Sequence, residues 1–161
     1  LSQQALMEIF IQNLGYLEDY QDKSGNFLDI TDWKRLKFDT DGQLTEIEIY
    51  VELLEGSLNF EAIPCTVSKI NVSYLNCTGE IPWGKLYDAV RYFIADKNNF
   101  YGTIDLAALP RDMNGLFCQN NAFSGTLNFE SLPESFAILD VSYNKLSGTL
   151  DLRAVKRAIM T

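Results

Sequence analysis

The sequence predicts an α/β solenoid, in which stacked coils build a parallel β-sheet and little helix occurs outside an N-terminal cap. Five glycines recur at a constant spacing of 23 residues, and each opens a similar five-residue phrase. Apolar residues recur at fixed positions before each glycine, whereas residues 1–43 show no repeat. A period of this length is typical of solenoids, because one coil cannot bury its apolar face alone. The repeated glycines are Gly56, Gly79, Gly102, Gly125 and Gly148.

Each repeat carries apolar residues at relative positions 1, 4, 6 and 11. Positions 4 and 6 enclose one residue that faces outward, so they predict a short strand with one buried face. In the third repeat, Phe93 and Ala95 hold these positions. We expect five parallel strands that pair in sequence order, over residues 46–50, 69–73, 92–96, 115–119 and 138–142. Each repeated glycine is expected to have a positive φ or to lie where a Cβ would clash.

Asparagine occupies position 9 in three of the five repeats, as Asn98, Asn121 and Asn144. A buried amide at this point can bond backbone groups of its own coil and of the next one, where the non-helical turn leaves them unpaired. Glu52 and Leu75 replace the asparagine in the first two repeats. These two coils are therefore expected to be less regular.

Residues 44–161 resemble the leucine-rich repeat superfamily. The phrase Gly79-Glu80-Ile81-Pro82 is similar to the plant-type class, and phrases such as Gly102-Thr103-Ile104-Asp105-Leu106 resemble 23-residue variants of protist proteins. The resemblance implies a horseshoe or arc with the parallel sheet on its concave side. It also implies short strands of a second sheet after the glycines, over residues 57–60, 80–83, 103–106 and 126–129.

Residues 1–43 are expected to form an N-terminal cap over the first coil. Ala5, Leu6, Ile9 and Phe10 recur at helical spacing and predict an amphipathic helix over residues 2–13, followed by a polar loop over residues 18–26. Trp33 and the stretch 38–47 resemble plant-type N-terminal caps, although the paired cysteines common in such caps are absent. Residues 44–161 then contain five repeats and the start of a sixth, in one domain with the cap.

The charge distribution argues against nucleic-acid binding. The chain carries 13 basic and 22 acidic residues, and the net charge of −9 falls entirely within residues 1–66. A nucleic-acid interface needs a basic stripe, and the one basic cluster is Arg153, Lys156 and Arg157. No apolar run approaches the roughly 18 residues of a membrane span, so insertion into a membrane is not expected.

No motif in the sequence indicates catalysis, a metal or a cofactor. The chain contains no histidine, which removes histidine-based acid–base, triad and metal-ligand chemistry. Asp39, Asp41 and Gly42 fit a plain turn better than a calcium loop, because Lys37 stands where the first ligand would be. No glycine-rich nucleotide-binding motif occurs.

The three cysteines leave the cellular compartment undetermined. Cys77 and Cys118 hold apolar repeat positions about two coils apart, beyond disulfide reach, and Cys65 has no evident partner. Unpaired thiols favour a reducing compartment. Two glycosylation sequons, at Asn71 and Asn76, would instead fit a secreted protein, but composition alone produces about this number of sequons.

The outward-facing strand positions supply the candidate binding site. They place four large apolar side chains together on the concave face, where such a cluster is typical of a contact surface for protein. An acidic rim precedes this patch and includes Glu46 and Glu48, with Glu52 and Glu55 beyond them. The four apolar residues are Tyr92, Ile94, Phe117 and Ile138.

These features favour a non-catalytic protein-binding or scaffold module that uses its concave face. Two alternatives remain open at this point. The chain could be a structural subunit of a large assembly that contacts its neighbours through its ends and convex side, or a cell-surface recognition or adhesion domain. An enzyme is the least favoured class, because no reacting group is visible.

The C-terminal end is expected to need a cover. The repeat stops in mid-phrase, since Ile159 holds the first position of a sixth repeat and the sequence ends at Thr161. An open end of a solenoid exposes apolar side chains and an unpaired strand edge. We therefore expect further chain or a partner to cover it.

Overall fold

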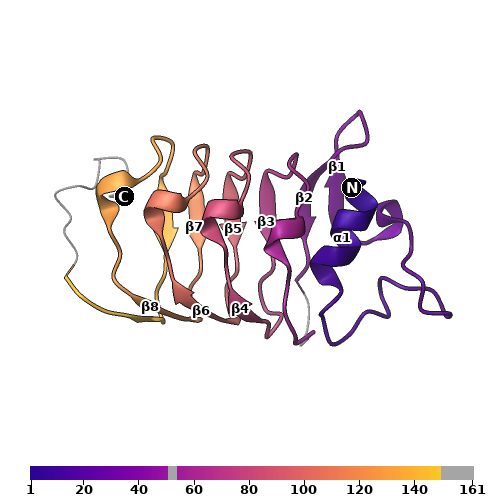
Figure 1. Cartoon of the computed structure of the whole chain (residues 1–161), viewed down its shortest axis with the longest axis horizontal. Helices are drawn as coiled ribbons and strands as arrows, with labels where there is room; N and C mark the ends of the chain where they lie inside the picture. Colours follow the sequence, from indigo (N-terminus) through magenta and orange to yellow (C-terminus); the bar gives the residue numbers. More distant parts are fainter. Residues whose placement is uncertain (51–53, 150–161) are drawn as a thin grey trace.

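The main sheet of the molecule contains one strand from each repeat, in sequence order. The computed structural model describes residues 1–50 and 54–149. From the N-terminal end, the strands lie side by side along the long axis of the molecule (Figure 1). They are β1 (Leu36–Phe38), β2 (Leu44–Glu48), β3 (Lys69–Asn71), β5 (Tyr92–Ile94), β7 (Gly115–Phe117) and β9 (Ile138–Asp140).

The register between these strands follows the 23-residue period. From β2 to β9 all neighbours are parallel, and Glu46 pairs with Lys69, which pairs in turn with Tyr92. The same row continues through Gly115 to Ile138. The predicted strands are thus confirmed. Strand β2 begins earlier than predicted, and each later strand is three residues long.

The N-terminal cap combines one α-helix with an additional strand. Helix α1 (Gln3–Ile11) begins after Ser2, whose Oγ accepts a hydrogen bond from the Ala5 amide at 3.2 Å. Strand β1 pairs antiparallel with β2 and was not predicted. Asp39 Oδ1 accepts from the amides of Asp41 and Gln43 at 2.9 and 2.8 Å, so the predicted turn closes a β-hairpin.

The second sheet differs from the expectation in its position along the chain. Its strands precede or include the repeated glycines, whereas residues 57–60, 80–83, 103–106 and 126–129 were expected to form it. Each glycine has a positive φ, for example +88° at Gly102, and turns the chain away from the sheet. The four strands are β4 (Thr78–Glu80), β6 (Asn99–Thr103), β8 (Ala122–Gly125) and β10 (Lys145–Leu146).

A short 3-10 helix begins at the last residue of each segment where those strands were expected. In three of the four repeats this helix is capped by a side chain three residues after the glycine: Asn59, Asp105 and Asn128 each accept a hydrogen bond from the amide two residues later. Such caps favour a turn over an extended strand. The 3-10 helices are η1 (Ile30–Asp32) in the cap, then η2 (Phe60–Ala62), η3 (Trp83–Lys85), η4 (Leu106–Ala108) and η5 (Phe129–Ser131).

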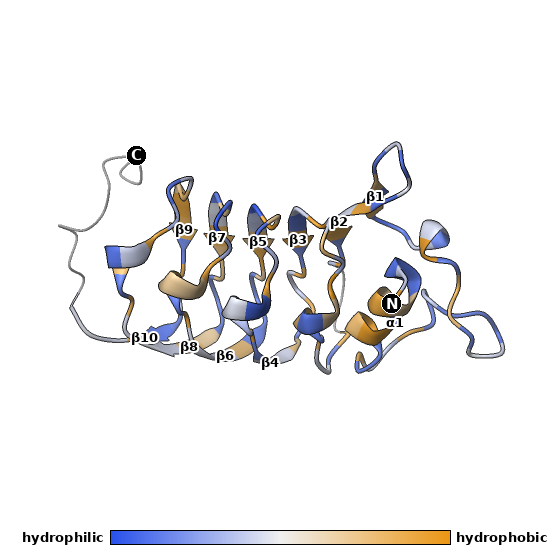
Figure 2. Cartoon of the chain, turned by 45° about the horizontal axis from the view of Figure 1, so that its top comes forward, coloured by the Kyte–Doolittle hydropathy of each residue, from blue (hydrophilic) through white to orange (hydrophobic). Residues whose placement is uncertain are grey.

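A continuous core fills the space between the two sheets and the 3-10 helices (Figure 2). Aromatic rings link successive coils: the Phe60 ring lies 5.4 Å from Phe93, and Trp83 lies 5.4 Å from Phe93 and 6.0 Å from Phe123. Phe10 of α1 reaches Phe60 at 5.8 Å. The cap therefore shares one core with the repeats.

The asparagines at position 9, of which Asn98 is buried and Asn121 and Asn144 are partly exposed, form the expected ladder, but toward the preceding coil. Asn98 Nδ2 donates to the carbonyl of Val72 at 2.7 Å, and Asn98 Oδ1 accepts from the amide of Cys77 at 3.0 Å. Asn121 and Asn144 repeat this geometry one coil further along each time. The expectation that the amides would reach the next coil was wrong. Glu52 lies outside the described residues.

Candidate functional site

The solvent-facing side of the main sheet, here called the concave face, presents its side chains in rows that cross the strands. Row one contains Tyr92, Gly115 and Ile138 in direct register, and row two contains Ile94 beside Phe117. The 23-residue period aligns like positions in neighbouring strands, and alternation places every second residue on this face. The structure thus brings together the four predicted residues Tyr92, Ile94, Phe117 and Ile138, which we call the concave patch.

The concave patch is exposed, and its two aromatic rings converge over one glycine. Tyr92 is 40% and Ile138 is 47% exposed, while Ile94 and Phe117 are partly exposed. Gly115 lies buried beneath them. A Cβ at Gly115 would be 2.9 Å from Cε2 of Phe117 and 3.1 Å from Cδ1 of Tyr92. The absence of a side chain at Gly115 therefore lets the two rings lie against the sheet.

Two residues of the predicted acidic rim, Glu46 and Glu48, are paired with lysines. Glu46 Oε2 lies 2.8 Å from the Lys37 ammonium and 3.9 Å from that of Lys69, and Lys69 also pairs with Glu48. The hydrogen bond from Lys69 lowers the pKa of Glu48, and the hydrogen bond to Glu46 raises the pKa of Lys37. These partly exposed pairs fix side chains beside the patch more than they create a negative field.

A third row on the same face was not singled out from the sequence. It lies two residues beyond row two, and cross-strand hydrogen bonds continue there, from Tyr74 N to Asp96 O at 2.9 Å and from Lys97 N to Gln119 O at 3.1 Å. Ser73 and Asp96 are buried and Gln119 is partly exposed. The alternation that located rows one and two could have located this row as well.

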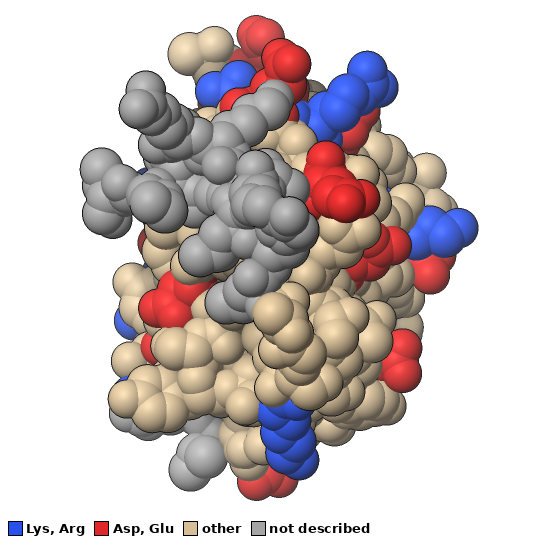
Figure 3. All heavy atoms as spheres, turned by 90° about the vertical axis from the view of Figure 1, so that its left-hand side faces the viewer, with Lys and Arg blue, Asp and Glu red and all other residues tan. Residues whose placement is uncertain are grey.

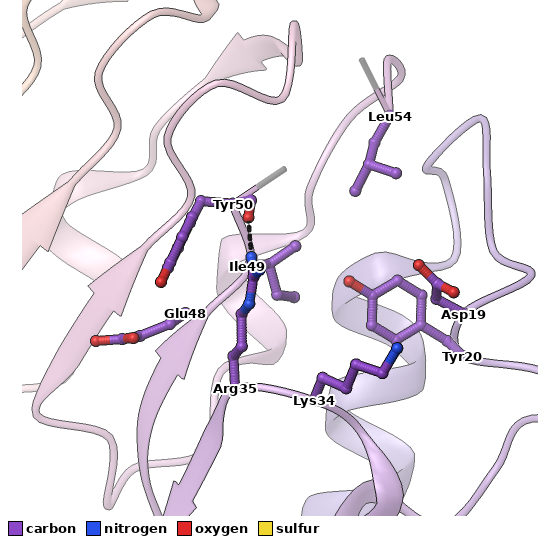
Figure 4. A pocket seen from close by; sticks show the side chains of 8 residues that line it. All are labelled: Asp19, Tyr20, Lys34, Arg35, Glu48, Ile49, Tyr50 and Leu54. Atoms are coloured by element: carbon purple, nitrogen blue, oxygen red, sulfur yellow. Dashed lines mark hydrogen bonds between the residues drawn. The ribbon is translucent and has the colours of Figure 1, made fainter. Parts of the chain in front are cut away.

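A cavity of about 180 Å³ lies where the cap meets the first coil. The Tyr20 ring faces Ile49 and the Arg35 guanidinium across it (Figure 4). Arg35 donates to the carbonyl of Tyr50 and lies 4.4 Å from the centre of its ring, and burial raises the pKa of Tyr20 to about 12. The cavity is lined by Asp19, Tyr20, Lys34, Arg35, Glu48, Ile49, Tyr50 and Leu54.

The cysteines lie apart from the concave patch. Cys77 and Cys118 are fully buried, as their repeat positions predicted, whereas Cys65 is exposed. Burial raises the pKa of the Cys77 thiol to about 12 and raises that of Cys118 further, so neither is an activated nucleophile. Among residues 1–50 and 54–149, no group of three cysteine or acidic side chains is arranged to hold a metal ion.

Viewed from the C-terminal end, the visible described surface carries both basic and acidic side chains, mainly along the upper and right-hand margins of the view (Figure 3). Arg153, Lys156 and Arg157, with the predicted start of a sixth repeat, lie outside the described residues. No described helix has the length and apolar character needed to cross a bilayer.

Neither a protein-family model nor a curated protein matches the sequence, but many solved structures match the fold. The ectodomain of the receptor kinase SOBIR1 from Arabidopsis thaliana superimposes with a TM-score of 0.72 at 16% identity, over 99% of this chain and 90% of that one. A chain of the BIR3–SERK2 complex from the same plant gives 0.72 at 15% identity, over 90% of this chain and 83% of that one.

A much longer receptor contains the same fold as part of its length. The leucine-rich repeat ectodomain of GASSHO1/SCHENGEN3 from Arabidopsis thaliana, in complex with CASPARIAN STRIP INTEGRITY FACTOR 2, gives a TM-score of 0.78 at 19% identity. The match covers 92% of this chain and 19% of that one. With the 23-residue register and the asparagine ladder, these likenesses show that the chain has the leucine-rich repeat fold seen in plant receptor ectodomains.

Proposed function

We propose that this chain is a non-catalytic protein-binding module whose contact surface is centred on the concave patch. The observation that carries the proposal is a cluster of large apolar side chains held in the open by regular strands. Tyr92 and Ile138 are the most exposed of the four, at 40% and 47%. Exposed aromatic and aliphatic side chains on a rigid support are typical anchors of protein interfaces.

The chemistry of the remaining face supports binding over catalysis. The sequence has no histidine, and both buried thiols have raised pKa values, so neither offers a nucleophile at neutral pH. In rows one and two, Glu46 and Glu48 are engaged by lysines, and Asp140, beside Phe117, accepts hydrogen bonds from the amide and hydroxyl of Ser142. An apolar centre with a polar margin matches the usual anatomy of an interface.

The size of the sheet sets the scale of the contact. The five parallel strands from β2 to β9, at about 4.8 Å spacing, cover roughly 20 Å, which is less than the width of a typical interface of about 800 Å² per partner. The patch alone thus supports a weak contact or the centre of a larger one. Two of the similar solved structures are themselves protein complexes, GASSHO1/SCHENGEN3 with its factor and BIR3 with SERK2, which is consistent with a recognition role for this fold.

A comparative capture experiment tests the proposal. Immobilised protein and the double variant Ile94→Ala, Phe117→Ala are exposed to extract of the source organism, and the retained proteins are quantified by mass spectrometry. A partner retained by the unaltered chain should bind the double variant about 30-fold or more weakly, because each truncation removes an interface anchor. Thermal unfolding should change little, since both side chains are partly exposed.

Tyr87→Ala is the matched control, because Tyr87 is a 48% exposed aromatic on the turn after η3, away from the concave face. Its removal should leave the capture unchanged. If the double variant retains every partner at unaltered affinity, or if only Tyr87→Ala loses one, the concave patch is not the contact surface. The second result would favour a structural subunit that contacts its neighbours through the convex side.

A further inference from the structure

The cavity between the N-terminal cap and the first coil, here called the junction cavity, combines apolar and polar lining. Ile49 and Leu54 are buried and supply its apolar part. The Tyr20 ring faces Ile49 across the cavity and is held edge-on against Trp33, with 5.0 Å between the ring centres (Figure 4). A volume of about 180 Å³ leaves space for a compact molecule of roughly ten non-hydrogen atoms.

The Tyr20 hydroxyl points into the junction cavity and forms no hydrogen bond with a described residue (Figure 4). A phenol hydroxyl in a largely buried position usually has a partner. Because burial raises the pKa of Tyr20 to about 12, the hydroxyl keeps its proton at neutral pH and can donate. The positive charge of Arg35 acts on this pKa in the opposite direction, so the guanidinium and the hydroxyl interact across the cavity.

Two basic side chains gather at the junction cavity although this part of the chain is rich in acids. Residues 1–66 contain four basic residues, and two of them, Lys34 and Arg35, line the cavity and are exposed at its edge. Lys34 forms no ion pair with any described residue. Arg35 donates to the Tyr50 carbonyl and stacks on that ring at 4.4 Å, so most of its five N–H groups have no acceptor among the described residues.

The backbone of Arg35 is held in an unfavourable conformation at this point. Its φ of +69° lies in the left-handed region, which costs a non-glycine residue about 1–2 kcal/mol. The Arg35 carbonyl accepts a hydrogen bond from the Glu48 amide at 3.2 Å, which continues the pairing of β1 with β2. The hairpin therefore fixes the place of Arg35 beside the cavity at some cost in stability, as is common at binding sites.

The carboxylates of the lining do not cancel these two positive charges. Glu48 is hydrogen-bonded by Lys69, which lowers its pKa. Asp19 is the other acidic residue of the lining; it is exposed and has no basic partner among the described residues. Two cations thus face one unpaired carboxylate, which favours an anionic ligand.

We propose that the junction cavity binds a small organic carboxylate with a compact apolar body. The carboxylate accepts hydrogen bonds from Arg35, Lys34 and the Tyr20 hydroxyl. The apolar body packs on Ile49 and Leu54. Inorganic phosphate is less suitable, because it would leave the apolar part of the lining uncovered. This site lies in the cap and is independent of the concave patch, so it adds a second binding activity to the proposed function.

Three probes separate the charge of the ligand from its apolar body. The ¹⁵N-labelled chain is titrated at constant ionic strength with benzoate, with benzamide, which is a neutral molecule of the same shape, and with acetate, which has almost no apolar body. Benzoate should shift the amide signals of Tyr20, Arg35 and Ile49 in a saturable way, with a Kd in the low millimolar range or below. Benzamide and acetate should each bind at least tenfold more weakly.

Variants of single lining residues test the assigned contacts. Arg35→Gln removes the guanidinium and should weaken benzoate binding about tenfold or more. Tyr20→Phe removes only the hydroxyl, keeps the ring against Trp33, and should weaken binding several-fold. Lys37→Gln is the matched control, because Lys37 is an exposed cation of β1 that pairs with Glu46 and does not line the cavity. It should leave the Kd unchanged, and the amide spectrum of each free variant reports whether the native fold is kept.

Several outcomes would overturn the inference. They are equal binding of benzoate and benzamide, the absence of a saturable shift with benzoate, and shifts confined to residues outside the junction cavity. Unchanged affinity for benzoate in both Arg35→Gln and Tyr20→Phe would overturn it as well. None of these results affects the concave patch, which the capture experiment tests separately.

Discussion

A single amide side chain connects two coils at each asparagine of the ladder. Asn121 Nδ2 lies within 2.8 Å of the Ala95 carbonyl in the preceding coil and within 3.2 Å of two carbonyls in its own. Its Oδ1 accepts from the amide of Phe100 at 3.0 Å. One residue thus bonds four backbone groups at the turn, three carbonyls and the Phe100 amide.

Replacing Asn121 by leucine should lower the free energy of unfolding by about 3 kcal/mol, because the partly buried Phe100 amide loses its acceptor and three carbonyls each lose one donor, while the volume stays similar. Asn99→Ala is the matched control: its exposed amide bonds Asn76 at the surface, and its loss should cost less than about 1 kcal/mol. Urea unfolding followed by circular dichroism measures both. Equal losses would contradict the role of the ladder.

The position of the ladder could be predicted from the sequence, but its direction could not. Asn98, Asn121 and Asn144 stand out at position 9, yet both neighbouring coils lie 23 residues away, so the period does not say which one the amide reaches. Alternation also places Ser73, Asp96 and Gln119 on the concave face. That Ser73 Oγ and Gln119 Oε1 are buried without a hydrogen bond in the described part of the chain depends on the side-chain conformations of their neighbours.

At the scale of the elements, the junction between the cap and the first coil depends on a close backbone contact. Gly56 has φ +88° and forms a bridge with Leu14, and a Cβ at Gly56 would lie 2.1 Å from the Asn13 carbonyl oxygen. The Asn59 amide donates to the Phe10 carbonyl nearby, at 3.0 Å. Gly56 therefore allows α1 to pack against the first coil, and it also turns the chain.

Gly56→Ala should destabilise the protein by more than about 3 kcal/mol, since a new methyl group would displace the backbone of the cap. Gly25→Ala isolates the conformational cost alone: Gly25 has φ +81°, but nothing lies within 4 Å of its Cβ position. That control should cost about 1–2 kcal/mol. Differential scanning calorimetry compares them, and similar losses would show that the contact at Gly56 is not needed for docking.

The second sheet shows which elements the sequence did not predict correctly. Its strands were placed after the glycines by resemblance, but Asn59, Asp105 and Asn128 cap 3-10 helices there. Asparagine and aspartate are turn-forming residues, so their occurrence three residues after the glycine could have indicated a turn there in place of a strand. Strand β1 was harder to predict from the sequence, because three residues are too few to display an alternation of apolar and polar side chains.

For the whole molecule, the 23-residue period was sufficient to predict the parallel sheet, its order and its register. The period fixes which residues align across coils, so the members of the concave patch could also be named from the sequence. The convergence of Tyr92 and Phe117 over Gly115, and the ion pairs of Glu46 and Glu48, required side-chain positions in three dimensions.

Stability should fall at alkaline pH. Burial raises the pKa of Cys77 and of Tyr20 to about 12 each in the folded chain, from ordinary values of 9.0 and 10.0. The folded state keeps these protons while the unfolded state loses them. Their contribution is therefore complete below about pH 9 and is lost as pH rises toward 12. Urea unfolding between pH 8 and pH 12 should show this decline, with a smaller slope in Cys77→Ala. An equal slope in both proteins would exclude the thiol as a cause.

The central claim, that a partner binds the concave face, is tested most directly by hydrogen–deuterium exchange of the full chain with and without a captured partner. The account predicts added protection in peptides that cover β5, β7 and β9, where the concave patch lies, and no change around η3, η4 and η5. Protection of the 3-10 helices with unchanged exchange in the three strands would contradict it, and would place the contact on the convex side.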